Sequence, residues 1–211
     1  GRRIPFVGYR ELQEKLRETV KGVKRVAMEY VPGGAIPYVS RVDAGTIEMV
    51  RACGVQVVSS ADLVQHFEAR WSPEALESHR RAARGLKEVL QATFDHVARA
   101  AGNGGTITEH SVQQFMCVQF SDRGFHHDPP IVAVNAHSGN PHYEPRPHDS
   151  APIRKGDLLL LDLWCREKPE GSIWADITWM AYVGKDVPAR QREIWDIVAG
   201  ARDAAVSFLK E

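Results

Sequence analysis

The sequence predicts a mixed α/β (α+β) fold from three observations. Apolar β-type runs alternate with helical stretches in the first third of the chain, an order typical of α/β layers. A long amphipathic helical pattern follows, and two apolar runs joined by a short polar connection come after it. At 211 residues, the chain is long enough to bury a core in one large domain or two small ones.

The first part of the chain, residues 1–71, is predicted to be part of a small α/β domain that ends in a linker helix. Its apolar runs have the short length and β-branched content of strands, and the stretches between them repeat at helical spacing. We therefore predict helices over 9–20, 44–53 and 61–69, and strands over 26–30 and 55–58.

A second domain is predicted to span residues 72–211. Ser72, Pro73 and Glu74 supply an N-cap, a proline at the first helical position and an acid in the first turn. Further helices are expected after Thr106 or Thr108 and after Pro188. Apolar residues of the last helix recur at helical spacing and predict a buried stripe, namely Ile194, Val198, Ala201, Ala205 and Phe208.

An antiparallel hairpin is predicted between the apolar runs 158–164 and 173–183. Their connection, residues 166–171, is short and polar and contains proline and glycine, as hairpin turns do. A turn centred near Pro169 would pair position 162 with 176 and position 164 with 174. The tryptophans at 164 and 174 would then form a cross-strand pair.

The hairpin carries two aspartates, Asp162 and Asp176, inside its apolar runs. Aspartate is depleted in strands, and a carboxylate that faces another is destabilising. Opposed side chains have Cβ atoms roughly 5 Å apart, whereas the ions of a two-metal site lie about 3.5–4 Å apart. The pattern therefore predicts that both aspartates are metal ligands. The alternative is that they end the strands or face solvent.

Composition limits the possible partners. The 27 basic and 27 acidic residues balance, which argues against nucleic acid or an anionic membrane as the main partner and favours a small or peptide-like substrate. The three cysteines lack the spacing of a zinc ribbon or a disulfide framework, so a reducing cytoplasm fits best. No apolar stretch reaches the length of a membrane span.

Three segments carry a resemblance to a known family: Asn140–Tyr143, Gly156–Asp162 and Ala175–Thr178. Together they resemble the pita-bread metallopeptidases, and the branch of Xaa-Pro dipeptidase (prolidase) and aminopeptidase P is closest in layout. The resemblance implies the C-terminal part of a small α/β domain followed by the first half of a pita-bread (creatinase/aminopeptidase-like) fold. It is strongest from Val132 to Gly184.

The resemblance also implies site residues. Asp162 and Asp176 match ligands of a site for two divalent metal ions (Mn, Co or Zn), and His142 matches a histidine that holds the substrate or the tetrahedral intermediate. The implied reaction is hydrolysis of the peptide bond before proline by metal-activated water. Two features depart from the family pattern. Trp179 stands where an arginine is usual, and the two aspartates are 14 positions apart, a longer spacing than usual.

Family members complete the metal site with one histidine and two glutamates further along the chain, and this sequence contains no such set after the hairpin. We therefore expect an N-terminal fragment of a metallopeptidase that binds metal weakly and is inactive alone. An uncovered sheet edge would favour a homodimer or other self-association.

Three alternatives stay open. The chain could belong to a non-catalytic pita-bread module that binds peptides, or to a creatinase-like amidinohydrolase. The third concerns the segment before the hairpin. We interpret its histidines as surface residues, but one or two of them could instead lie near the metals: His126, His137 and His148.

Overall fold

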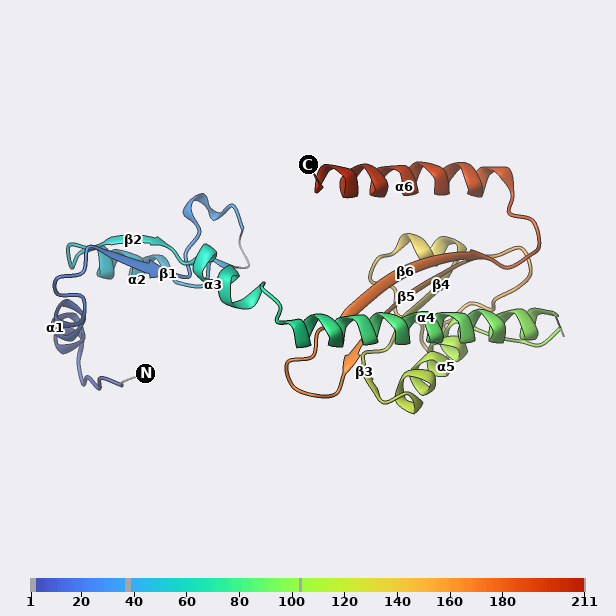
Figure 1. Cartoon of the computed structure of the whole chain (residues 1–211), viewed down its shortest axis with the longest axis horizontal. Helices are drawn as coiled ribbons and strands as arrows, with labels where there is room; N and C mark the ends of the chain where they lie inside the picture. Colours follow the sequence, from blue (N-terminus) through green and yellow to red (C-terminus); the bar gives the residue numbers. More distant parts are fainter. Residues whose placement is uncertain (1–2, 37–38, 103, 211) are drawn as a thin grey trace. The chain divides into compact units, whose positions relative to one another are not determined.

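The computed structural model describes residues 3–36, 39–102 and 104–210, which form a mixture of helices and sheets (Figure 1). The predicted mixed α/β class is therefore confirmed. The chain divides into two compact units, residues 1–71 and 72–211. Within the described ranges, no helix combines the length and the apolar character that a membrane crossing requires.

The first unit is built on two parallel strands, β1 and β2, which pair Val26 with Val57. A parallel pair needs a crossover connection, and a helix provides it here. The carboxylate of Asp43 caps that helix by accepting a hydrogen bond of 2.9 Å from the N–H of Thr46. The elements are α1 (Tyr9–Thr19), β1 (Arg25–Met28), η1 (Pro32–Gly34), α2 (Ala44–Arg51), β2 (Gln56–Ser59) and α3 (Ala61–Glu68).

In chain order, the described part of the second unit runs through two α-helices, two strands, a short 3-10 helix, two more strands and a last α-helix. Its elements are α4 (Pro73–Gly102), α5 (Glu109–Asp122), β3 (Phe125–His127), β4 (Ile131–Val134), η3 (Asn135–Gly139), β5 (Leu158–Glu167), β6 (Ala175–Tyr182) and α6 (Ala189–Phe208).

Strand β5 is the centre of an antiparallel sheet. Strands β3 and β4 pair with different parts of β5, while β6 pairs with it from Leu158 to Cys165. From Leu158 to Arg166 of β5 the odd-numbered residues are buried and the even-numbered ones are half-buried, so the two faces of the sheet differ. We call the face of the even-numbered residues the open face.

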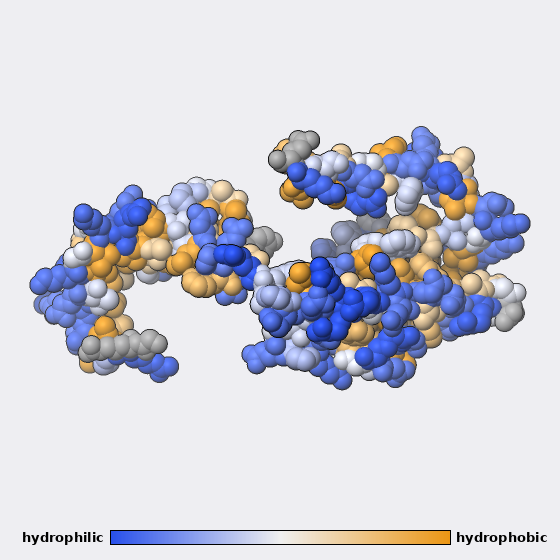
Figure 2. Space-filling view, in the orientation of Figure 1, coloured by the Kyte–Doolittle hydropathy of each residue, from blue (hydrophilic) through white to orange (hydrophobic). Residues whose placement is uncertain are grey.

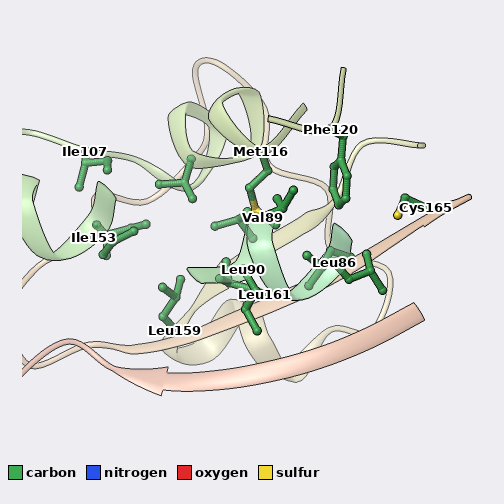
Figure 3. Close-up of a cluster of buried hydrophobic side chains, with 14 of the residues drawn as sticks. Leu86, Val89, Leu90, Ile107, Met116, Phe120, Ile153, Leu159, Leu161 and Cys165 are labelled. Carbon is green, nitrogen blue, oxygen red and sulfur yellow. The ribbon is translucent and has the colours of Figure 1, made fainter. Parts of the chain in front are cut away.

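Helices α4 and α5 cover the other face of the sheet (Figure 1). Apolar side chains of both helices form one core with Leu159, Leu161 and Leu163 of β5. Figure 3 shows Leu159 and Leu161 in this cluster. Helix α5 begins at a capping box, in which Thr108 and Ser111 bond each other's backbone N–H. The core thus fixes the position of β5, and with it the side chains of the open face.

Gly85 of α4 lies directly under the ring of Phe125 from β3. A Cβ atom at position 85 would come within 2.3 Å of this ring, whereas one at Gly200 of α6 would meet nothing within 4 Å. Gly85→Leu is expected to lower the free energy of unfolding by about 1–3 kcal/mol through overpacking. Gly200→Leu is expected to raise it by about 0.8 kcal/mol through helix propensity. Urea denaturation of both variants checks this, and a change of the same sign in both would contradict it.

The predicted pairing within the hairpin is wrong by two residues. Asp162 faces Thr178 and Trp164 faces Asp176, so neither the aspartates nor Trp164 and Trp174 are directly opposed. The tight turn lies at Pro169–Ser172, closed by the N–H of Ser172 on the carbonyl of Pro169, and Gly171 has a φ of 80°. Only glycine adopts this φ readily, so Gly171 moves the turn centre beyond Pro169.

Helix α6 forms where a last helix was predicted, but none of its described residues is buried, so its predicted buried stripe is wrong. Ile194, Val198 and Phe208 of that stripe are exposed, at 47%, 63% and 75%. Apolar side chains of α6 are visible at the surface among hydrophilic ones (Figure 2). The physical reason is that α6 packs little against the other described elements. Gln191 and Trp195 of its first turns line a hollow together with Leu158 of β5 and Tyr182 of β6.

A paired arginine and glutamate tie α4 to the end of β5. Nε and Nη2 of Arg81 donate to the two carboxylate oxygens of Glu167 at 2.8 Å each. These hydrogen bonds lower the pKa of Glu167 below its ordinary value of 4.5. A lowered pKa means that the pair stabilises the fold above pH 4.5 and that this contribution is lost as the pH falls through the lowered pKa.

Glu167→Gln is therefore expected to lower the urea midpoint slightly at pH 7 and to lower it less at pH 3, where part of the contribution is lost. Glu170→Gln, in the exposed turn, is the matched control and should change neither midpoint. An equal loss for Glu167→Gln at both pH values would mean that the charge pair contributes nothing.

Candidate metal centre

The two aspartates lie on the open face of the sheet, in adjacent strands. Asp162 of β5 faces Thr178 on β6 and Ile131 on β4, and Asp176 of β6 faces Trp164. The register thus confirms that both aspartates share one face, because a shift of two residues preserves the alternation of side chains. They are diagonal neighbours, a relation that places backbones about 7–8 Å apart and side chains somewhat closer.

The charges of the two carboxylates influence each other. Asp176 is an exposed residue, but partial desolvation of its carboxylate and then the negative charge of Asp162 raise its pKa above the ordinary value. The hydroxyl of Thr178 donates a hydrogen bond of 2.6 Å to Oδ1 of Asp162, which holds this carboxylate in one orientation. A cation between the two carboxylates would relieve their repulsion, since carboxylate oxygens are ligands for divalent ions.

A hollow of about 250 Å3 opens beside Asp162. Its floor consists of residues of β4, β5 and β6 that include Leu160 and Thr178, and its wall is the segment from Ser138 to Pro141. The hollow therefore gives a small group access to Asp162 from the side of the segment that leads to His142.

His142 itself is exposed at the surface. Its backbone N–H donates to Oδ1 of Asn140 at 3.0 Å, which fixes the turn just before it. The structure describes no contact between its imidazole and either aspartate. It thus places His142 at the end of the wall beside the hollow but does not bring it into contact with the aspartates.

Glu109 is a residue of this region that sequence reasoning missed. Its side chain is fully buried, and the carboxylate accepts hydrogen bonds from the N–H of Val134 at 2.8 Å and the N–H of Ala151 at 2.7 Å. Nδ1 of His137 lies 2.9 Å from Oε1, and the hydroxyl of Tyr143 donates to Oε2 at 2.6 Å. An acid in the first turn of a helix is common, so the sequence carried no signal that this one is buried.

His137, interpreted as a surface histidine, is only partly exposed. It is half-buried, it contacts Glu109, and its ring stacks on Tyr143 with a centroid distance of 4.4 Å. Burial, together with the hydrogen bond to Glu109, raises the pKa of Tyr143 far above its ordinary value, so this hydroxyl stays protonated. His126 and His148 are exposed, as interpreted.

Aromatic side chains bound the other end of the aspartate pair. The indole N–H of Trp164, beside Asp176, donates to Oδ2 of Asp128 at 3.1 Å. Further along the open face, the guanidinium of Arg166 lies over the ring of Trp174, 5.5 Å from its centroid. This end of the open face can therefore contact apolar or planar groups of a ligand.

The donor set fits part of a metal centre. Two carboxylates on one face, one of them oriented by Thr178, suit a divalent cation, but a stable site needs more oxygen or nitrogen ligands. In the part of the chain that the structure describes, no group of three or more histidine, cysteine, aspartate or glutamate side chains is placed to hold a metal. Asp162 and Asp176 thus form an incomplete ligand set.

Comparison with known proteins gives two findings. The sequence profile of metallopeptidase family M24 matches residues 77–211, more than half of the chain and all of the hairpin region. A search of curated protein sequences finds no match.

Solved structures with a similar fold include two prolidases and one aminopeptidase. The prolidase from Pyrococcus horikoshii OT3 is 20% identical with a TM-score of 0.58, over 96% of this chain and 53% of that chain. The recombinant prolidase from Thermococcus sibiricus is 18% identical with a TM-score of 0.57, over 92% and 48%. The X-prolyl aminopeptidase from Caenorhabditis elegans, described as a cytosolic enzyme with a di-nuclear active site, is 20% identical with a TM-score of 0.55, over 64% and 22%.

The chain thus spans about half the length of the two prolidases. At these identities the likeness concerns the fold.

Proposed function

Because the chain belongs to metallopeptidase family M24, we propose that the protein containing it is an Xaa-Pro peptidase, which hydrolyses the peptide bond before proline. The observation that carries the proposal is the pair Asp162 and Asp176 on one face of a hairpin within the matched residues. The resemblance to pita-bread metallopeptidases and the predicted fold class are confirmed by the family match and the solved structures.

In this proposal, Asp162 and Asp176 hold two divalent ions, with Mn, Co and Zn as candidates. Such ions, when bound, lower the pKa of water and polarise a carbonyl group. Thr178 orients the carboxylate of Asp162 through its hydrogen bond. Two carboxylates alone bind such ions weakly, so further ligands come from other parts of the whole protein. We accordingly propose that the 211-residue chain by itself is inactive.

His142 is proposed to act on the substrate. An imidazole N–H beside the hollow can donate a hydrogen bond to the scissile carbonyl oxygen and continue to hold it as negative charge develops there. Trp164 lines the face beside Asp176 and can contact the apolar ring of proline. The chain's own residues would thus orient the substrate, while the hollow beside Asp162 admits its reacting end.

The test is an assay of the whole protein on matched substrates. Gly-Pro, Gly-Ala and creatine are incubated with the protein supplied with Mn, Co or Zn, and the released products are measured. The proposal expects Gly-Pro to be hydrolysed at least about tenfold faster than Gly-Ala, and the activity to disappear with a chelator. Turnover of creatine alone would identify an amidinohydrolase instead, and peptide binding without cleavage would identify a binding module.

A further inference from the structure

The buried carboxylate of Glu109 is bound by a single segment of the chain, residues 134–151. Its donors are spread along the whole segment: Val134 at its start, His137 and Tyr143 within it, and Ala151 at its end. No part of the Glu109 side chain is exposed. One carboxylate at the start of α5 therefore anchors the segment at four points.

We propose that Glu109 is a positioning residue that sets the place of His142 relative to the aspartates of the hairpin. This inference rests on the proposed function, because the position of His142 matters only if His142 contacts the substrate. Tyr143, which directly follows His142, is held by its hydroxyl at 2.6 Å from Oε2 of Glu109. The anchor thus acts on the residue next to the one that contacts substrate.

The anchored segment also forms the wall of the hollow beside Asp162. Ser138 to Pro141 line that hollow and lie between the two side chains that Glu109 holds, His137 and Tyr143. Asn140 in turn binds the N–H of His142. A change at Glu109 would therefore move the wall and His142 together, although Glu109 lies in a different element and touches neither aspartate.

The chemistry of the anchor requires a carboxylate. Oε1 of Glu109 accepts from the N–H of Val134, and Oε2 accepts from the N–H of Ala151 and the hydroxyl of Tyr143. Nδ1 of His137 lies within hydrogen-bond distance of both oxygens, so both act as acceptors. Glutamine has the same shape but only one acceptor oxygen, so its NH2 group would face donors. A backbone N–H cannot reverse its role, so Glu109→Gln leaves the N–H of Val134 or Ala151 unpaired without changing the volume.

The experiment is a double-mutant cycle in the whole protein, with Gly-Pro as substrate. Glu109→Gln, His142→Ala and the double variant are compared for kcat, KM and metal content. We expect Glu109→Gln to lower kcat by about tenfold to 100-fold, because small misplacements of a reacting group have effects of this size. KM and metal content should stay within about threefold, and the double variant should match His142→Ala within about twofold.

Gln113→Leu is the matched control for loss of a buried hydrogen bond. Gln113 lies one turn further along α5 and bonds the carbonyl of Pro130, outside the anchored segment. Its replacement should lower stability and leave kcat unchanged. If Glu109→Gln does not fold, Tyr143→Phe replaces it in the cycle, with an expected fall in kcat of about threefold that also vanishes in the His142→Ala background.

The outcomes separate the two claims. If His142→Ala lowers kcat while the Glu109 and Tyr143 variants do not, the anchor has no positioning role and the proposed role of His142 stands. If the fall in kcat of the double variant equals the product of the falls in Glu109→Gln and His142→Ala, the two residues act independently, and the positioning role is overturned as well. If His142→Ala leaves kcat unchanged, the proposed role of His142 fails, and the inference about Glu109 fails with it.

Discussion

Asp162→Asn and Asp176→Asn are each expected to lower kcat/KM of the whole protein for Gly-Pro by about 1000-fold or more. Asparagine keeps the shape of the side chain but loses its negative charge and one acceptor oxygen, and it is a poorer ligand for a divalent ion. Metal ions contribute several kcal/mol to charge stabilisation in hydrolysis, and about 4 kcal/mol corresponds to 1000-fold in rate.

Asp186→Asn is the matched control for these variants. Asp186 is exposed and follows the hairpin without taking part in it. The activity of the Asp186→Asn variant should therefore stay within about twofold of that of the unaltered protein. Unfolding temperatures show whether the hairpin variants are folded. If Asp162→Asn and Asp176→Asn fold and keep their activity, the two aspartates are not metal ligands in the reaction.

Glu109→Leu is expected to lower the free energy of unfolding of the chain by about 3–5 kcal/mol, the range typical of breaking a buried charged network. The N–H groups of Val134 and Ala151 would lose their acceptor, as would the side chains of His137 and Tyr143. Gln113→Leu removes one buried hydrogen bond from the same helix and should cost only about 1–3 kcal/mol.

Urea denaturation of the 211-residue chain measures both variants. The difference between them isolates the four-point anchor from the general effect of placing leucine at a buried polar position. Equal losses in the two variants would show that the contacts of Glu109 add nothing beyond one ordinary hydrogen bond.

The hairpin shows how far the sequence could lead. Alternation along a strand has a period of two, so placing Asp162 and Asp176 on one face needed only the parity of their positions. The register needed the conformation of the turn as well. Gly171, with its positive φ, sets the centre of the turn, so the register predicted from a turn centred near Pro169 is wrong by two residues.

Glu109 and α6 show what the sequence could not reveal. The acid at the start of α5 has the pattern of an ordinary first-turn acid, and its burial arises because residues far along the chain fold over it. In α6, the apolar spacing predicted burial, but spacing says only that one side of a helix is apolar. Whether another element covers it depends on tertiary contacts, and the described residues supply few.

Anomalous X-ray diffraction from crystals of the whole protein grown with Mn tests directly whether Asp162 and Asp176 are metal ligands. Two anomalous peaks are expected on the open face of the hairpin, each about 2.0–2.3 Å from carboxylate oxygens of Asp162 or Asp176. Both peaks should be lost from crystals of the double variant Asp162→Asn, Asp176→Asn. Occupied Mn sites elsewhere in the protein, with no peak within about 4 Å of either aspartate, would contradict the central claim.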